Sequence, residues 1–191
     1  MNRHDEKLVL GVTGATGTTA ASLLLDQSPW PVALITSRCG AAVYEHECEP
    51  VANLAARAAV TYADDDGFAP IASGSVATVG MVVLPCTTGT LGKIASGLCD
   101  TLITRAAHCH LKERRPLILC VRETPWTAID FANAERVTAA GGIVMPLSPP
   151  YYMFAKEDPD SVSMRDLLAR YVERVLAVLG RPASQTWGDL C

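Results

Sequence analysis

The stretch KLVLGVTGATGTTAASLLLDQ, residues 7–27, joins a short apolar run, a glycine-rich turn and a helical pattern without a break. The run Lys7–Val12 is rich in Val and Leu and predicts a buried strand. Thr18–Gln27 carries Ala and Leu on one face and predicts a helix. A strand that passes through a glycine turn into a helix is typical of sheets in which strands and helices alternate, so this stretch favours an α/β fold.

Apolar runs and helical patterns alternate along the rest of the chain. Because the runs are uniformly apolar, we expect their sheet to be covered on both faces. The sequence predicts a flavodoxin-like or Rossmann-like α/β fold, a doubly wound and mainly parallel sheet with helices on both faces. Further strands are expected at Pro31–Thr36, Val79–Leu84, Leu117–Val121 and Gly142–Leu147, with a short strand and an acidic loop within Val60–Asp66. Helices are expected at Cys39–Glu47, Val51–Arg57, Thr90–Gly97, Asp100–Glu113, Pro125–Ala140 and Val162–Leu179, with a loop at Ser148–Asp160.

Length and composition point to one globular domain. A chain of 191 residues favours a single domain over residues 1–191, with tails at 1–6 and 181–191. The net charge of -4 leaves no basic footprint for nucleic acid. No stretch approaches the ~20 apolar residues of a membrane span. The seven cysteines are odd in number and form no CxxC pair, which indicates reduced thiols and a cytoplasmic location.

Residues suited to ligand binding follow the predicted strands. In open parallel sheets, ligands bind beyond the carboxyl ends of the strands. The strand bodies are almost entirely apolar, whereas the segments after them carry small, hydroxyl, charged and aromatic side chains. The sequence therefore predicts a ligand site along one edge of the sheet. The segments concerned are Gly14–Gly17, Ser37, Pro85–Thr90, Arg122–Pro125 and Pro146–Tyr152.

The first loop, GVTGATGTT at residues 11–19, has the composition of an anion-binding turn. Glycines let the backbone approach an anion, and the following helix offers free N–H groups. The spacing is G-x-x-G-x-x-G, which differs from the dinucleotide fingerprint G-x-G-x-x-G. Ser37 and Arg38 also stand where an acidic partner for a ribose diol is expected. A mononucleotide is therefore favoured over NAD, with a purely structural tight turn as the alternative.

Two further groups of residues suit a phosphorylated ligand. Thr87, Thr88, Gly89 and Thr90 precede a predicted helix and suit a phosphate or a flavin ring edge, or serve only as a helix cap. Arg105 and Lys112 are seven residues apart, so both project from one face of their helix. They form either a clamp for a second phosphate or a solvated charged face.

Other reactive residues are less specific. Arg122 and Glu123 follow a buried strand directly, so Glu123 is either a proton shuttle or part of an internal salt bridge. His108–His110 has the composition of a metal cluster, but neighbouring helical residues diverge and a fourth ligand is missing, so no metal is expected. Cys86 has no His partner in the sequence pattern and is interpreted as a buried small hydrophobe.

Several motifs occur together in a fixed order: GVTGATG, ASGS (residues 72–75), PCTTGTLGKIASGLCDTLITRAA (85–107), LKERRPLIL (111–119), RETP (122–125) and a Pro-Tyr-Tyr loop. From about residue 8 to 180, the chain resembles the flavin prenyltransferases, the UbiX-like partners of UbiD-type decarboxylases. The resemblance implies transfer of a dimethylallyl group from dimethylallyl phosphate or diphosphate to reduced FMN. The prenylated FMN would serve a UbiD-type decarboxylase. It also implies no metal and a homo-oligomer, usually a dodecamer, with sites between subunits.

The resemblance also implies roles for single residues. Those implied around FMN are Gly14, Ala15, Thr16, Ser37, Thr87, Thr88, Gly89, Thr90 and Arg105. Those implied around the prenyl phosphate are Lys112, Arg122, Tyr152 and Arg174, with Arg170 as the fallback because the segment after Tyr152 is longer than usual. Catalytic roles are implied for Glu123, Thr16, Glu47 and Lys112, with Glu49 as a competitor of Glu47. Thr16 stands where the family usually has Ser.

Two alternatives within the flavoprotein superfamily stay open. One is a flavin carrier that binds FMN without prenyl transfer. The other is an oxidoreductase similar to the flavin-dependent cysteine decarboxylases. Members of that branch usually carry a catalytic His near the first helix, and this chain has no His between residues 5 and 45. The presence of Lys112, Glu123 and Tyr152 favours the transferase.

Overall fold

A computed structural model describes residues 6–155, 157–184 and 186–189. Within them the strands form one six-stranded sheet in the order β3-β2-β1-β4-β5-β6, and every neighbouring pair is parallel. The order reverses beside β1, as a doubly wound sheet requires, so the predicted fold class is confirmed. The strands are β1 Lys7–Val12, β2 Val32–Thr36, β3 Val60–Ala63, β4 Thr78–Cys86, β5 Leu117–Val121 and β6 Ile143–Val144.

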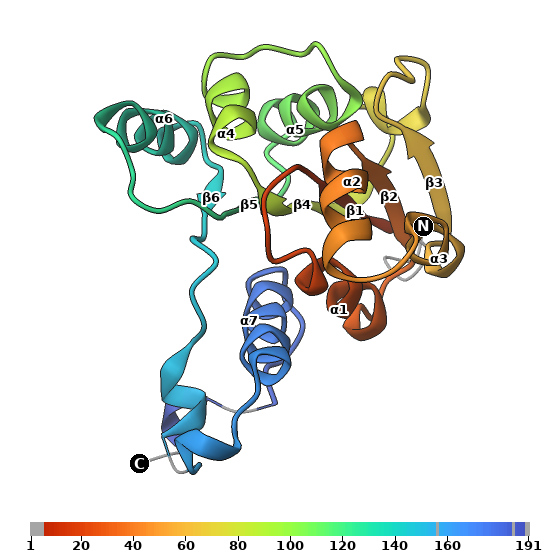
Figure 1. Ribbon diagram of the computed structural model, residues 1–191. Helices are drawn as coiled ribbons and strands as arrows, with labels where there is room; N and C mark the ends of the chain where they lie inside the picture. The colour runs from red at the N-terminus through yellow and green to blue at the C-terminus, as the bar shows by residue number, and fades with distance from the viewer. Residues whose placement is uncertain (1–5, 156, 185, 190–191) are drawn as a thin grey trace.

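Helices cover both faces of the sheet (Figure 1). One buried cluster lies between the sheet and α1, α3 and α7, and a second lies between the sheet and α4 and α5. Along β1, Leu8 and Leu10 belong to the first cluster and Val9 to the second, because successive strand side chains point to opposite faces. The helices are α1 Thr19–Gln27, α2 Arg38–Glu47, α3 Val51–Arg57, α4 Thr88–Ala95, α5 Leu102–Lys112, α6 Ala128–Ala139 and α7 Met164–Val178.

The start of α6 differs from the sequence prediction. Pro125 was expected in the first turn of the helix, but it lies before the helix, after a cis peptide bond from Thr124. The helix begins after Thr127, whose hydroxyl accepts a hydrogen bond from the Asp130 amide, while the Asp130 carboxylate accepts from the Thr127 amide. This reciprocal cap satisfies two amide groups that would otherwise lack partners, which explains the later start.

The last strand is shorter than the predicted Gly142–Leu147. The amides of Met145 and Leu147 still donate to carbonyl groups of β5, but Pro146 between them has no amide to donate. Proline is tolerated on an edge strand, where its nitrogen faces away from the neighbouring strand. The chain therefore stays extended beside β5 beyond the two residues of β6.

The segment after β6 leads away from the sheet and returns through α7 (Figure 1). One short 3-10 helix, Tyr151–Phe154, lies within the predicted loop Ser148–Asp160, and a second, Pro159–Ser161, spans its end. The predicted tail 181–191 is anchored in part, because Arg181 Nη1 donates to the Gln27 carbonyl at 2.8 Å and the Ser184 amide donates to the Glu173 carboxylate. A further short 3-10 helix spans Trp187–Asp189, whereas residues 1–5, 185, 190 and 191 of the predicted tails lie outside the described residues. In the described chain, every helix is too short or too polar to cross a bilayer.

Candidate functional site

A cavity of about 370 Å³ opens at the carboxyl edge of the sheet, the edge at which the carboxyl ends of the parallel strands meet. Its walls come from the segments after β1, β2, β3 and β4 and from the first turn of α5. Most of its polar groups are hydroxyls. The lining residues are Thr13, Gly14, Ser37, Cys39, Asp64, Thr87, Gly89, Thr90, Lys93, Thr101, Ile103 and Thr104.

Three helices of the described chain begin at this cavity. Ser37 caps α2, Thr87 caps α4 and Thr101 caps α5, and all three line the cavity. Each cap hydroxyl accepts a hydrogen bond from an amide in the first turn, at 3.0, 3.1 and 3.3 Å. Other first-turn amides have no partner within a helix, and the helix dipoles place partial positive charge at these ends. The cavity is therefore suited to an anionic group such as a phosphate.

Thr13 joins two walls of the cavity. It is 3% exposed, and its hydroxyl donates to the Pro85 carbonyl at 2.8 Å and accepts from the Thr87 amide at 2.9 Å. These bonds fix the first loop against the segment between β4 and α4. Thr13 has no signal in the sequence, because its partners lie more than 70 residues away in the chain.

Two charged side chains line the cavity and were also missed. Lys93 forms an ion pair with Asp100 at 2.7 Å. The Asp64 carboxylate accepts a hydrogen bond from the Ile103 amide at 3.0 Å, and burial raises its pKa above the ordinary value. Thr101 stands just before the apolar residues of α5, a cap signal that could have pointed to this wall from the sequence.

Glu47 lies at the end of α2 and binds the first loop. Its carboxylate accepts hydrogen bonds from the amides of Gly17 and Thr18 at 2.9 and 2.8 Å and from the Thr18 hydroxyl at 2.7 Å. Partial burial raises the pKa of Glu47, but these hydrogen bonds and the charge of Arg122 outweigh it, so the pKa lies below its ordinary value. Its competitor Glu49 points elsewhere, toward the side chains of Tyr44, Asn53 and Arg57.

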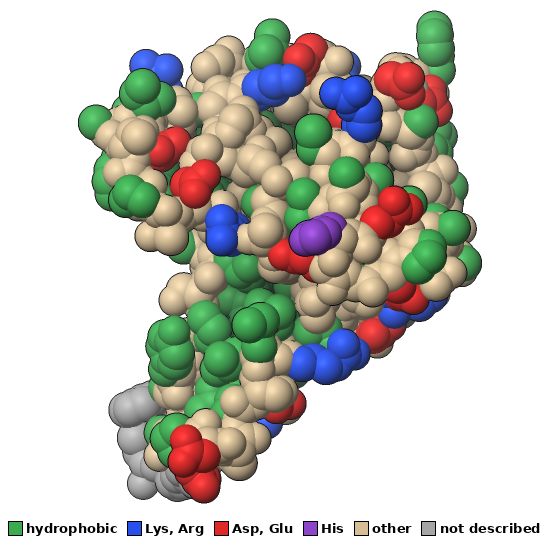
Figure 2. All heavy atoms as spheres, in the orientation of Figure 1, with side chains coloured by type: hydrophobic (Ala, Val, Ile, Leu, Met, Phe, Trp, Pro, Cys, Tyr) green, Lys and Arg blue, Asp and Glu red, His purple; other side chains and the backbone are tan. Residues whose placement is uncertain are grey.

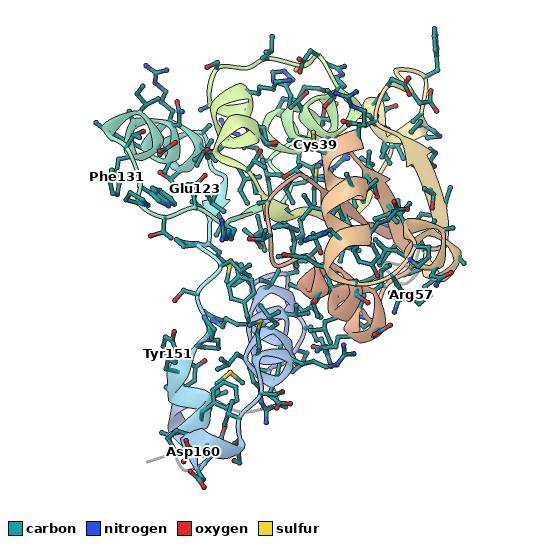
Figure 3. The ribbon with its side chains drawn as sticks, viewed as in Figure 1. Cys39, Arg57, Glu123, Phe131, Tyr151 and Asp160 are labelled. Carbon is teal, nitrogen blue, oxygen red and sulfur yellow. The ribbon has the colours of Figure 1, made fainter. Side chains whose placement is uncertain are left out.

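Arg122 and Glu123 lie at the end of β5, as predicted, and both are exposed. Figure 3 shows Glu123 beside α6 and Cys39 at the start of α2. Glu123 Oε1 accepts a hydrogen bond from the Thr124 amide at 3.1 Å, and Trp126 Nε1 donates to the Glu123 carbonyl at 3.0 Å. In the described chain, neither Arg122 nor Glu123 forms an ion pair within 4.0 Å, so the internal salt bridge is not formed.

Arg105 and Lys112 lie on one face of α5, as their spacing predicts, but outside the cavity. Arg105 Nε donates to the Ala72 carbonyl at 2.9 Å, and Lys112 Nζ contacts the Glu113 carboxylate beside Gly74. The helix starts at the cavity and has 11 residues, so Lys112 lies about 15 Å away along its axis. One chain therefore does not bring Lys112 to the cavity or to the end of β5.

The remaining predicted residues are spread along the same edge and α7. Thr16 is exposed at the tip of the first loop, next to the buried Ala15. Tyr152 lies in the 3-10 helix after β6, and Arg174 is exposed on α7. Arg170, the fallback for Arg174, is already paired with Glu173 at 3.2 Å.

Cys86 and the His108–His110 segment make structural contacts and do not line the cavity. Cys86 is fully buried, and burial raises the pKa of its thiol, so it is a poor nucleophile, as expected. Cys109 Sγ donates to the Ala72 carbonyl, and the His110 ring lies between the Thr78 hydroxyl and the Ala106 carbonyl. In the part of the chain that the structure describes, no three His, Cys, Asp or Glu side chains are arranged to hold a metal.

Comparison with known proteins places this arrangement in a family. The Flavoprotein family model matches residues 1–175. The chain is 39% identical to a flavin prenyltransferase UbiX of Thermoplasma acidophilum, over 91% of this chain and 94% of that protein. The chain belongs to the flavin prenyltransferase family. The family resemblance read from the motifs is thereby confirmed.

Two solved structures of UbiX and UbiX-like proteins share the fold over almost the whole chain. A crystal structure of AnUbiX (PadA1) in complex with FMN and dimethylallyl pyrophosphate superposes with a TM-score of 0.87 at 34% identity, covering 95% of this chain and 97% of that one. A dodecameric FMN-dependent UbiX-like decarboxylase from Escherichia coli O157:H7 superposes with a TM-score of 0.86 at 32% identity, covering 95% and 99%.

Proposed function

We propose that this protein is a flavin prenyltransferase, which transfers a dimethylallyl group from dimethylallyl phosphate or diphosphate to reduced FMN. The observation that carries the proposal is the meeting of three helix N-termini in one hydroxyl-lined cavity, next to the strand end that bears Arg122 and Glu123. The family and the relative crystallised with FMN and dimethylallyl pyrophosphate support it.

The residues of the cavity fit FMN. The amides and hydroxyls at the starts of α2 and α4 suit its phosphate, through Ser37, Thr87 and Thr90. Gly14 and Gly89 let the backbone come close to the ligand, and the rest of the first loop borders the ring. The bound reduced flavin supplies the nucleophile that receives the prenyl group. Within one chain the proposed FMN residues are Gly14, Ala15, Thr16, Ser37, Thr87, Thr88, Gly89 and Thr90, whereas Arg105, which the resemblance also implies, lies outside the cavity of its own chain.

The prenyl donor is held beside the end of β5. Arg122, Tyr152 and Arg174 bind its phosphate, and the guanidinium groups of Arg122 and Arg174 stabilise the charge that develops on the leaving oxygen. Glu123 donates a proton to that oxygen. Figure 2 shows hydrophobic side chains gathered at an indentation over α7 and the segment after β6. An apolar wall of this kind excludes water from the reacting allyl group.

Lys112 completes the phosphate site from a second copy of the chain. It lies at the far end of α5 in its own subunit, so a neighbouring subunit must supply it to the end of β5. We therefore propose a homo-oligomer, and a dodecamer like that of the Escherichia coli relative. We also propose that each chain is one domain, that the protein is cytoplasmic, and that prenylated FMN passes to a UbiD-type decarboxylase.

The proposal is tested by mass spectrometry of the flavin. The protein is mixed anaerobically with reduced FMN and, in separate reactions, with dimethylallyl phosphate or the diphosphate. We expect the flavin to gain the mass of one prenyl unit with at least one donor. Bound FMN of unchanged mass with both donors would overturn the proposal and support a flavin carrier.

A Glu123→Gln variant tests the proposed proton donor. We expect it to bind FMN as the wild type does and to turn over 10²–10⁴-fold more slowly, roughly the contribution of a positioned acid. Turnover equal to that of the wild type would remove Glu123 from the mechanism while leaving the transferase activity itself intact.

A further inference from the structure

The N-terminus of α1 lies at the same edge as those of α2, α4 and α5, but the protein's own carboxylate closes it. The amide of the cap residue Thr18 and that of Gly17, which precedes it, both donate to Glu47, at 2.8 and 2.9 Å. Carboxylate binding at a helix N-terminus is favoured by the helix dipole. Glu47 therefore occupies the start of α1, whereas the cap residues of the other three helices line the cavity.

The hydroxyl of Thr18 does not cap its own helix. Thr18 is the cap residue of α1, yet it has helical dihedral angles (φ -64°, ψ -19°) and its side chain makes no cap hydrogen bond. A Thr in this position usually accepts a hydrogen bond from an amide of its own helix. Here the hydroxyl is fully buried and donates to Glu47 Oε2 at 2.7 Å. Its hydrogen bond serves the carboxylate and not the helix.

We infer that Thr18 is a positioning residue for prenyl transfer, which holds the Glu47 carboxylate ionised and fixed at the first loop near Arg122. The inference deepens the proposed function and rests on it. It assigns Thr18 a role through Glu47 and no contact with flavin or prenyl donor.

The surroundings of Glu47 explain why the Thr18 hydroxyl matters. Hydrogen bonds donated to a carboxylate favour its charged form. Arg122, at the end of β5, is the charged group that faces Glu47, and the Cys48 thiol lies 3.8 Å from the Thr18 hydroxyl. Glu123 accepts one backbone hydrogen bond, from its neighbour Thr124. The hydrogen bonds that Glu47 accepts and the charge of Arg122 therefore suit an ionised Glu47 carboxylate.

The first test measures Glu47 directly, in the flavin-free protein. Carbon-13 NMR of Glu-labelled protein follows the carboxyl signal against pH, and Glu47→Gln identifies it by its loss. In Thr18→Val, which keeps the shape and removes the hydroxyl, we expect the midpoint to rise by about one pH unit, the size of one hydrogen bond to a charged group. Thr18→Ser keeps the hydroxyl and is expected to titrate close to the wild type. An unchanged midpoint in Thr18→Val would overturn the inference.

The second test measures prenyl transfer against pH. In Thr18→Val we expect the acid limb of kcat to move upward with the Glu47 midpoint. Near neutral pH, where Glu47 stays ionised in both proteins, we expect kcat to fall about tenfold because the carboxylate is no longer held in place, and Thr18→Ser to restore both. The matched control is Thr19→Val, since the Thr19 hydroxyl contacts Cys48 Sγ at 3.3 Å instead of Glu47. A shifted midpoint with unchanged kcat and acid limb would overturn the inference. Absence of product in the wild type would overturn the proposed function instead, whereas the NMR titration would still report whether Thr18 holds Glu47.

Discussion

Gly14 and Cys39 lie so close that a β-carbon on Gly14 would stand 2.6 Å from Cys39 Cβ. Real β-carbons do not approach atoms at that distance, so the first loop packs against the start of α2 only because residue 14 is glycine. Both residues line the cavity. The fit between loop and helix therefore sets the width of the proposed FMN site.

Gly14→Ala is expected to lower the free energy of unfolding by about 1–3 kcal/mol, the usual cost of overpacking, and to weaken FMN binding. Urea unfolding and quenching of flavin fluorescence measure the two effects. The double variant Gly14→Ala/Cys39→Gly removes the clashing carbon and is expected to recover much of the FMN affinity, with Cys39→Gly alone as the control. Equal FMN affinity in Gly14→Ala and wild type would contradict this packing.

Thr13→Val is expected to destabilise the protein by about 1–3 kcal/mol, because the Thr87 amide loses its acceptor in a buried place. FMN affinity is expected to fall as well, since Thr13 fixes two walls of the cavity to each other. Thr13→Ser keeps the hydroxyl and serves as the matched control in the same unfolding and binding measurements. Equal free energies of unfolding for Thr13→Val and Thr13→Ser would show that the Thr13 hydroxyl does not join the two loops.

Stability is expected to decrease in mild acid because of His110. The ring donates from Nδ1 to the Ala106 carbonyl, and its Nε2 lies 2.8 Å from the Thr78 hydroxyl. Burial, with the charge of Arg115, lowers its pKa despite the hydrogen bond to Ala106. As pH falls, His110 therefore takes up its proton in the unfolded chain before it does so in the folded protein. The contribution of His110 to the free energy of unfolding is complete above about pH 6.5 and is lost as pH falls toward the lower pKa of the folded protein.

The loss due to His110 is expected to reach about 1 kcal/mol between roughly pH 6.5 and pH 5.5. Urea unfolding at several pH values measures it. His110→Gln cannot take up the proton, so its stability is expected to change less over this range. A wild-type pH dependence equal to that of His110→Gln would show that His110 is not its source.

Mixed oligomers test whether Lys112 comes from a second subunit. Lys112→Ala and Glu123→Gln are each expected to be slow, whereas their coexpressed mixture is expected to recover about a quarter of wild-type turnover, because random assembly leaves that share of sites intact. The control mixture is Arg122→Ala with Glu123→Gln, which lie together at one strand end and leave no intact site. Recovery in neither mixture would place Lys112 and Glu123 in the same chain's site.

Elements whose structure depends on neighbouring residues were predicted correctly from the sequence. The strand Lys7–Val12 and the helix that follows it were predicted closely, because apolar periodicity and glycine preferences act within a few residues. The predicted start of α6 at Pro125 was wrong, because the cap at Thr127 outweighs the preference of proline for the first turn of a helix. Thr18 was predicted as the first residue of the helix, and nothing in the sequence pattern indicated its hydrogen bond to Glu47.

The sequence by itself determined the parallel α/β fold and the carboxyl edge on which the polar residues gather, because strand and helix periods and the direction of parallel strands follow from residue order. Only the tertiary structure decided which of those residues touch. Thr18 meets Glu47 across 29 residues of chain, and Thr13 meets Pro85 across 72. The tertiary structure also places Lys112 and Glu123 of one chain apart. Contacts between residues distant in the sequence depend on how whole helices and strands pack.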